Sequence, residues 1–341
     1  MKRIQRRIAA VILTAVTVPA AIAREPGTAY SFLDITSSAR IYGLGGVNIT
    51  TIDPGLGSAD QNPALLGTEM SGQTALGYMR YLGDSNFASV AYTHSSGERA
   101  SWQASIRYFG YGEMTRTDDT GQNLGSFSPK DMAFAGGYTH DLSPYLRGGF
   151  NVKFLYSSYE QYTALALATD LGINYYDPER DLSLSAVVAN LGGQIKRFDN
   201  SYNRLPVDVR LGWSQSFGTL PVRFSVTLWN LTEWHLPYYE TGDGSADSEP
   251  VLKDNFKSNL LRHIIFGADF VPTEKCYISL GYNYKTRTDM STYSRDILSG
   301  WSLGTGLNVA GFRLGLALGR PHTGATTMMI DLTLNINDII Y

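Results

Sequence analysis

The feature that most constrains this chain is a recurring stretch of about ten residues in which apolar and polar side chains alternate. Alternation with a period of two places successive side chains on opposite faces of a strand. Beyond residue 23, no apolar run reaches the roughly 20 residues that a membrane-spanning helix needs. The pattern therefore predicts half-apolar strands. The last stretch shows it most clearly, because Met328, Ile330, Leu332, Leu334 and Ile336 alternate with Met329, Asp331, Thr333, Asn335 and Asn337.

About fourteen segments pass this pattern test. In lipid an open sheet edge would leave backbone polar groups without partners, so a half-apolar sheet of this kind must close on itself. The sequence predicts an all-β fold, an antiparallel transmembrane β-barrel of about fourteen strands. A secreted β-sandwich or propeller is the alternative, but strands of about ten residues disfavour it. The predicted strands are Thr74–Leu82, Asn86–Thr93, Ser101–Tyr111, Asp131–His140, Tyr145–Ser157, Ala164–Tyr176, Leu182–Leu191, Val207–Phe217, Val222–Leu231, His263–Val271, Cys276–Arg287, Leu298–Val309, Gly311–Gly319 and Thr326–Asn337.

The connections between these segments alternate between short and long. Outer-membrane barrels have short periplasmic turns and long external loops. A strict alternation places both chain ends in the periplasm and the protein in the cell outer membrane. Aromatic residues also gather near the strand ends, where they favour the headgroup level of a membrane. The short turns are 141–144, 177–180, 218–221 and 272–275, and the long loops are 112–130, 192–206, 232–262 and 288–297.

Residues 1–23 differ from the rest of the chain. Lys2, Arg3, Arg6 and Arg7 precede an uncharged apolar run, and Ala21-Ile22-Ala23 offers a cleavage site. This is the pattern of a secretory signal peptide, since the apolar run is short for a membrane anchor. We therefore divide the chain into a signal peptide (1–23), an N-terminal segment (24–70) and the barrel (71–341).

The segment 24–70 does not alternate and contains small-residue motifs. About forty-five residues are too many for a simple leader, so we expect the segment to fill the barrel lumen as a plug on the periplasmic side. A polar, solvated pore is the alternative. The plug motif comprises Gly43, Gly45, Gly46, Asn62, Pro63 and Ala64. Alternation places these charges on the inner wall: Arg107, Arg147, Lys153, Asp170, Asp208, Arg210, Arg223, Asp269, Lys285, Arg313 and Asp331.

Little in the sequence points to enzyme chemistry. The five histidines are scattered and make no metal-ligand spacing, and the Gly43–Gly46 motif lacks the third glycine of a dinucleotide fingerprint. Residues 243–249 are acidic but lack the calcium-loop pattern. The net charge of −3 does not favour nucleic acid. We expect no catalytic, metal or cofactor residues, although a lipid hydrolase built on a spatial Ser–His pair stays open.

A family resemblance follows from these motifs. The run from Ala39 to Gly46, followed by Asn62-Pro63-Ala64-Leu65 ahead of a barrel, resembles the long-chain fatty-acid transporter superfamily. More narrowly, the opening Ser31–Ile35, the length and the C-terminal strands resemble the PorV/PorQ family of the type IX secretion system, and within it the PorQ-like members. The resemblance covers the mature chain. It implies a fourteen-stranded barrel with a plug and no catalytic residues.

The resemblance also implies partners. Such proteins hold a PorZ-like surface protein in an attachment complex with PorU and PorV. The sequence thus favours a non-enzymatic scaffold that anchors a surface partner through external loops, since loops on a rigid scaffold commonly carry binding. The candidate loop residues are Asp243, Asp247 and Glu249. The alternative function is transport of hydrophobic compounds across the outer membrane.

Overall fold

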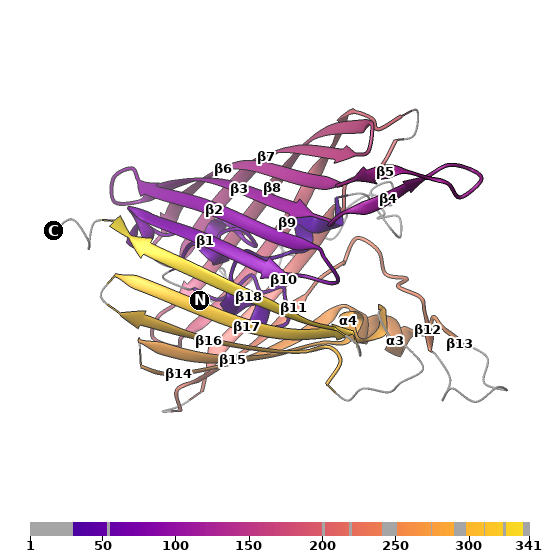
Figure 1. The fold of residues 1–341 in the computed structure, drawn as a ribbon. Coiled ribbons are helices and arrows are strands. Elements are labelled where there is room, and N and C mark those ends of the chain that lie inside the picture. Colours follow the sequence, from indigo (N-terminus) through magenta and orange to yellow (C-terminus); the bar gives the residue numbers. More distant parts are fainter. Residues whose placement is uncertain are drawn as a thin grey trace.

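The structure is a computed structural model, and it describes residues 30–52, 55–199, 202–217, 220–240, 251–273, 275–289, 298–309, 311–322 and 325–336. Fourteen strands form one closed antiparallel barrel (Figure 1), as the sequence predicts. In chain order the barrel strands are β1 (Gln73–Arg80), β2 (Asn86–Ser95), β3 (Ala100–Gly110), β6 (Lys130–Ser143), β7 (Leu146–Tyr159), β8 (Tyr162–Asp177), β9 (Leu182–Lys196), β10 (Asp208–Ser216), β11 (Val222–Leu228), β14 (Ile264–Thr273), β15 (Cys276–Asn283), β16 (Trp301–Val309), β17 (Phe312–His322) and β18 (Ala325–Asn335).

Closure comes from the pairing of the first strand with the last. Tyr78 of β1 faces Ile330 of β18 in an unbroken antiparallel register that runs from Gln73 to Arg80. Every sequential neighbour in the barrel is also antiparallel. This leaves no open edge, which is what a sheet in lipid requires.

All fourteen predicted strands exist, and most of their ends agree within a few residues. The predicted strand Leu182–Leu191 continues five residues further, to Lys196. The predicted strand Cys276–Arg287 is too long instead, because the strand ends at Asn283. The side chain of Asn283 accepts a hydrogen bond from the backbone of Thr286 and so begins the helix α4 (Tyr284–Asp289). The placement of Lys285 on the inner wall is therefore wrong, because its ammonium pairs with Asp289 within α4.

The two faces of the barrel differ as the alternation predicts. Lipid solvates apolar side chains, so large exposed hydrophobics belong on the outer face. The inner face carries glycine and polar residues instead, such as Ser279, Gly281 and Asn283 of β15. Large outward side chains include Leu76, Val90, Ile106, Phe134, Phe154, Leu171, Phe266, Leu280, Leu303, Leu316 and Met328.

The two rims of the barrel also differ. We call the rim with only short connections the turn end; β18 finishes there (Figure 1). The opposite rim, the loop end, carries α4, the helix α3 (Phe256–Arg262) and two hairpins, formed by β4 (Met114–Thr117) with β5 (Asn123–Phe127) and by β12 (Tyr238–Glu240) with β13 (Val251–Lys253).

The predicted strict alternation of short and long connections does not hold at the loop end. The connections β1–β2, β7–β8 and β17–β18 are short although they lie on that rim. The β7–β8 hairpin turns through residues 160 and 161, with Glu160 at a positive φ of 55°. β7 has 14 residues and β8 has 16, and both strands continue up to this turn without a separate loop.

Residues 30–52 and 55–72 lie inside the barrel, and we call them the lumen segment. They contain α2 (Ala39–Gly43) and the short 3-10 turns η2 (Ser31–Asp34), η3 (Leu56–Ser58), η4 (Pro63–Leu65) and η5 (Thr68–Met70). Helix α2 packs against β15 to β18, and η4 packs against β6, β7 and β8. The segment therefore touches opposite sides of the wall. No helix in the described ranges is long and apolar enough to cross a membrane.

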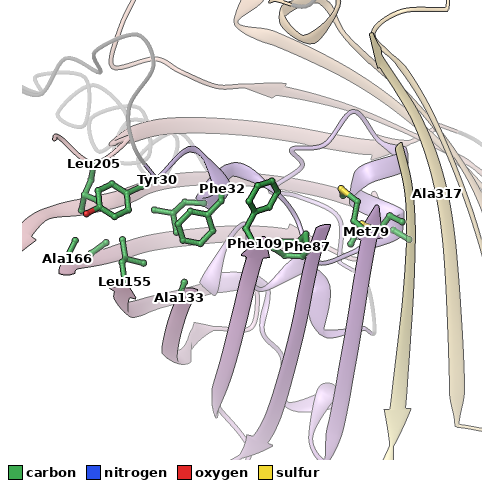
Figure 2. Close-up of a cluster of buried hydrophobic side chains, with 14 residues drawn as sticks. Tyr30, Phe32, Met79, Phe87, Phe109, Ala133, Leu155, Ala166, Leu205 and Ala317 are labelled. Atoms are coloured by element: carbon green, nitrogen blue, oxygen red, sulfur yellow. The ribbon is translucent and has the colours of Figure 1, made fainter. Parts of the chain in front are cut away.

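The lumen segment begins close to the loop end. Tyr30 and Phe32 are buried in one apolar cluster with Phe87, Phe109 and Leu155, which lie toward the loop end of β2, β3 and β7 (Figure 2). The predicted signal peptide lies outside the described residues. The predicted periplasmic position of the N-terminus also concerns residues outside them. The first described residue, Tyr30, lies near the loop end.

Candidate functional site

The lumen is the candidate site, and its first feature is the close contact between the lumen segment and the wall. A Cβ on Gly281 would overlap the backbone of Leu44 and Gly45, and a Cβ on Gly43 would lie 2.6 Å from the backbone of Gly304. Gly45 and Gly46 also have positive φ values of 102° and 90°, a conformation that glycine adopts without strain. Glycine is thus required on both sides of this contact.

The Asn62-Pro63-Ala64 motif fixes the opposite side of the segment. Asn62 is fully buried, and its side chain caps η4 by accepting from the backbone of Ala64 at 2.9 Å. Its amide nitrogen donates to the carbonyl of Ile49 at 2.9 Å and to the Ser185 hydroxyl of β9 at 3.1 Å. One side chain therefore holds two stretches of the segment and one strand together.

A buried ion pair ties α2 to the wall. The Arg40 guanidinium contacts the Asp269 carboxylate of β14 at 3.2 Å, and the two side chains are 8% and 2% exposed. Ser279 donates a second hydrogen bond to Asp269, and the Tyr277 ring lies 4.7 Å from the Arg40 guanidinium carbon. Such a pair is costly to break, because a buried guanidinium would lose this carboxylate.

A second network joins the lumen segment to β10. Arg210 of β10 contacts Asp208 at 2.7 Å and Asp34 of the lumen segment at 2.9 Å. It also donates to Gln61 at 2.9 Å. On the neighbouring wall, Lys153 pairs with Asp170 at 2.8 Å. Arg210 thus joins two separate parts of the lumen segment to one strand.

The remaining predicted inner charges lie in four places. Arg107 is buried on β3, and its Nε and Nη1 have no hydrogen-bond partner among the described residues. Arg147 lies at the turn end with Asp141 at 2.6 Å and Glu69 at 3.6 Å. Asp331 of β18 accepts from the backbone of Ala39 at 2.7 Å. Arg223 and Arg313 line a cavity at the turn end.

The loop end of the lumen contains an apolar cavity of about 180 Å³ between the lumen segment and the wall. Ile35, Tyr42 and Val47 line it from the segment. Tyr81, Trp229 and Pro321 line it from the wall, and the polar lining includes Asp34, Asn283 and Arg320. A cavity of ~150 Å³ with apolar walls binds benzene, so this space is large enough for one aromatic ring.

The sequence did not reveal this cavity or the role of Asp34 in the Arg210 network. Asp34 and Ile35 belong to a stretch without alternation, so no pattern assigned their side chains to a face. The predicted loop residues Asp243, Asp247 and Glu249 lie outside the described residues. Across the described ranges, no three His, Cys, Asp or Glu side chains form a group that could hold a metal ion.

Comparisons with known proteins identify the fold. No protein-family model and no curated protein matches the chain. Among solved structures, the Pseudomonas putida toluene transporter TodX matches with a TM-score of 0.53 and 10% identity, over 88% of this chain and 97% of that one. A TodX deltaS2S3 mutant, a monoaromatic hydrocarbon channel, matches with a TM-score of 0.53 and 12% identity, over 88% of this chain and 98% of that one. A Pseudomonas aeruginosa FadL homologue matches with a TM-score of 0.50 and 10% identity, over 88% of this chain and 98% of that one.

These likenesses establish the architecture. The chain has the barrel fold of TodX and of the FadL homologue. Identities of 10–12% show the fold alone. The narrower PorV/PorQ resemblance therefore enters only as a proposal.

Proposed function

We propose that this protein is a non-enzymatic outer-membrane channel that admits small hydrophobic compounds at its loop end. The observation that carries the proposal is the apolar cavity between the lumen segment and the wall. Support also comes from the fold, since similarly folded proteins are a toluene transporter and a monoaromatic hydrocarbon channel. This was the alternative that the sequence left open, and the comparisons favour it over anchoring.

The lumen segment is the proposed gate of this channel. Apolar contacts of Tyr30 and Phe32 close the lumen beside the cavity, while Arg40 and Arg210 pair with wall and segment carboxylates deeper in the barrel. Polar groups that are buried and paired resist displacement. A compound that enters the cavity would thus pass further only when part of this segment shifts.

Filling the cavity tests the transport proposal. The variant Ile35→Trp places a bulky ring where the compound would bind, and we expect the affinity for toluene to fall roughly tenfold or more. Binding is measured on purified protein by displacement of a fluorescent apolar probe, and toluene uptake by cells that produce the variant. Thermal unfolding reports whether the barrel is intact.

The matched control for this experiment is Leu280→Trp. Leu280 is 44% exposed on the outer face, so the same ring enters lipid or detergent there. Its toluene binding should equal that of the unmodified protein. Equal toluene binding by a folded Ile35→Trp protein would rule out the cavity as the binding site.

A second candidate function is the anchoring of a surface protein, and the loop end carries the observation that favours it. Val251 and Leu252 are each 54% exposed, Tyr239 is 62% exposed and Phe256 is 69% exposed. We call these four residues the loop-end patch. Exposed apolar patches commonly mark interaction sites. The resemblance to the PorV/PorQ family suggests a PorZ-like partner, held together with PorU and PorV.

Polar substitution of the loop-end patch tests anchoring. We expect Leu252→Ser with Phe256→Ser to release the surface partner into the medium of cells that have not been crosslinked, because exposed aromatic residues are frequent binding hot spots. The crosslinked partner is identified by mass spectrometry from intact cells. Leu220→Ser is the control, since Leu220 is 68% exposed at the turn end. Retention of the same partner by the double variant would contradict an anchoring role for this patch.

A further inference from the structure

The apolar cavity at the loop end also contains polar lining groups, and several of these already form hydrogen bonds within the protein. The Tyr42 hydroxyl pairs with the Thr327 hydroxyl of β18. The side chains of Asn283 and Ser302 donate to backbone carbonyls of the lumen segment at 3.1 Å and 2.9 Å. These donors therefore fix the lumen segment to the wall and are not left for a bound compound.

Tyr81 differs from these lining residues. It lies in the turn between β1 and β2, and its ring packs edge-on against Phe109 with the ring centroids 5.8 Å apart. Its hydroxyl forms no hydrogen bond with any residue that the structure describes. The Asp34 carboxylate and the Tyr42 hydroxyl, which belong to two other lining residues, are close enough to act on it electrostatically. The Tyr81 hydroxyl is thus a donor and acceptor among the lining groups that the protein leaves unused.

Trp229 is a second lining residue with an unused polar group. It follows β11, is 8% exposed and packs with Val47 and Ile265. Its Nε1 is buried, and within the described part of the chain its N–H has no acceptor. Buried polar groups nearly always have a partner in native proteins. Two residues of one apolar cavity therefore each offer a hydrogen bond that the protein itself does not complete.

We propose that the loop-end cavity takes small aromatic compounds that carry a neutral oxygen substituent, as phenol does, in addition to hydrocarbons. Tyr81 is the specificity-determining residue, because its hydroxyl bonds that oxygen while Ile35 and Val47 contact the ring. Neither Tyr81 nor Trp229 carries a charge that would offset the cost of burying an anion, so the substituent is neutral. The inference rests on the proposed transport function and names the substrate class of the same cavity.

Phenol and toluene are matched probes for this inference, because they differ only by a hydroxyl in place of a methyl group. Their affinities for the purified protein are measured by displacement of a fluorescent apolar probe. Tyr81→Phe keeps the ring that contacts Phe109 and removes only the hydroxyl. We expect the variant to bind phenol roughly fivefold more weakly, through loss of one hydrogen bond, and to bind toluene as before. Tyr145→Phe is the control and should change neither affinity, since Tyr145 is 49% exposed at the turn end.

Three results would overturn this inference while toluene binding, and with it the transport proposal, stands. One is unchanged phenol affinity in the Tyr81→Phe protein. Another is an equal loss of affinity for phenol and toluene, which would assign Tyr81 a structural role only. The third is phenol binding that survives Ile35→Trp, which would place phenol outside the cavity. Failure of both compounds to bind the unmodified protein would instead overturn the transport proposal, and this inference with it.

Discussion

Replacing Gly281 with valine is expected to push the lumen segment away from the wall while the barrel itself still closes. A Cβ at Gly281 would overlap the backbone of Leu44 and Gly45, and backbone atoms cannot move aside as a flexible side chain can. Because Gly281 faces inward, its strand pairing with Gly267 and Ser302 uses backbone groups that valine retains. Valine also favours strands, so β15 itself should tolerate the change.

The consequence should be large in electrical measurements. If the lumen segment blocks the barrel, its displacement opens an aqueous path lined by the inner charges. We expect Gly281→Val to raise single-channel conductance in planar bilayers from near zero to a level roughly typical of an open barrel. Limited proteolysis should also cut the variant within residues 39–46, whereas burial should protect this stretch in the unmodified protein.

Gly136→Val is the matched control for this change. An added Cβ at Gly136 would meet nothing within 4 Å, so the same substitution in β6 fits without displacement. The control should keep the low conductance and the protease resistance. Low conductance in a folded Gly281→Val barrel would show that the contact between Gly281 and the segment does not close the lumen.

Replacing Asp269 with alanine is expected to destabilise the protein by about 3 kcal/mol or more. The change leaves Arg40 charged and 93% shielded from solvent without its carboxylate, and it also leaves Ser279 without its acceptor. The free energy of unfolding is measured by urea denaturation in detergent or lipid. Hydrogen exchange of the amides in α2 should also become faster, because α2 loses its ion pair with β14.

A double variant separates loss of the charge pair from loss of packing. Arg40→Met combined with Asp269→Leu removes both charges and keeps apolar volume, so much of the lost stability should return. Asp118→Ala is the negative control, because Asp118 lies in the exposed β4–β5 hairpin and contacts no lumen residue among its hydrogen bonds. A double variant as unstable as Asp269→Ala would indicate that the ion pair is not the cause.

These two experiments address the same physical question, which is how firmly the lumen segment is held. Gly281 allows close approach, and Arg40 supplies a charged contact to the same side of the wall. If both variants release the segment, its attachment depends on β14 and β15. If Gly281→Val releases the segment but Asp269→Ala does not, the Asn62 and Arg210 contacts on the other side suffice to hold it without the Arg40–Asp269 pair.

The strands were predictable from sequence because their signal is local. In β17, Phe312, Leu314 and Leu316 face lipid while Arg313 and Gly315 face inward, and this alternation is visible without knowledge of any partner strand. Closure also followed, since an open edge is not viable in a membrane. The error at Tyr284–Asp289 arose because the alternation continues by chance past Asn283, whose side chain begins a helix instead.

The sequence by itself determined the strand number, the two faces of the barrel and the residues that the lumen segment needs for close contact. Only the tertiary structure decided which charges meet, because Arg40 and Asp269 are 229 residues apart and Arg210 and Asp34 are 176 apart. Such pairs depend on how the segment is oriented inside the closed wall, and no periodicity encodes that orientation. The same holds for the two cavities, whose linings combine residues of the lumen segment with residues from several strands.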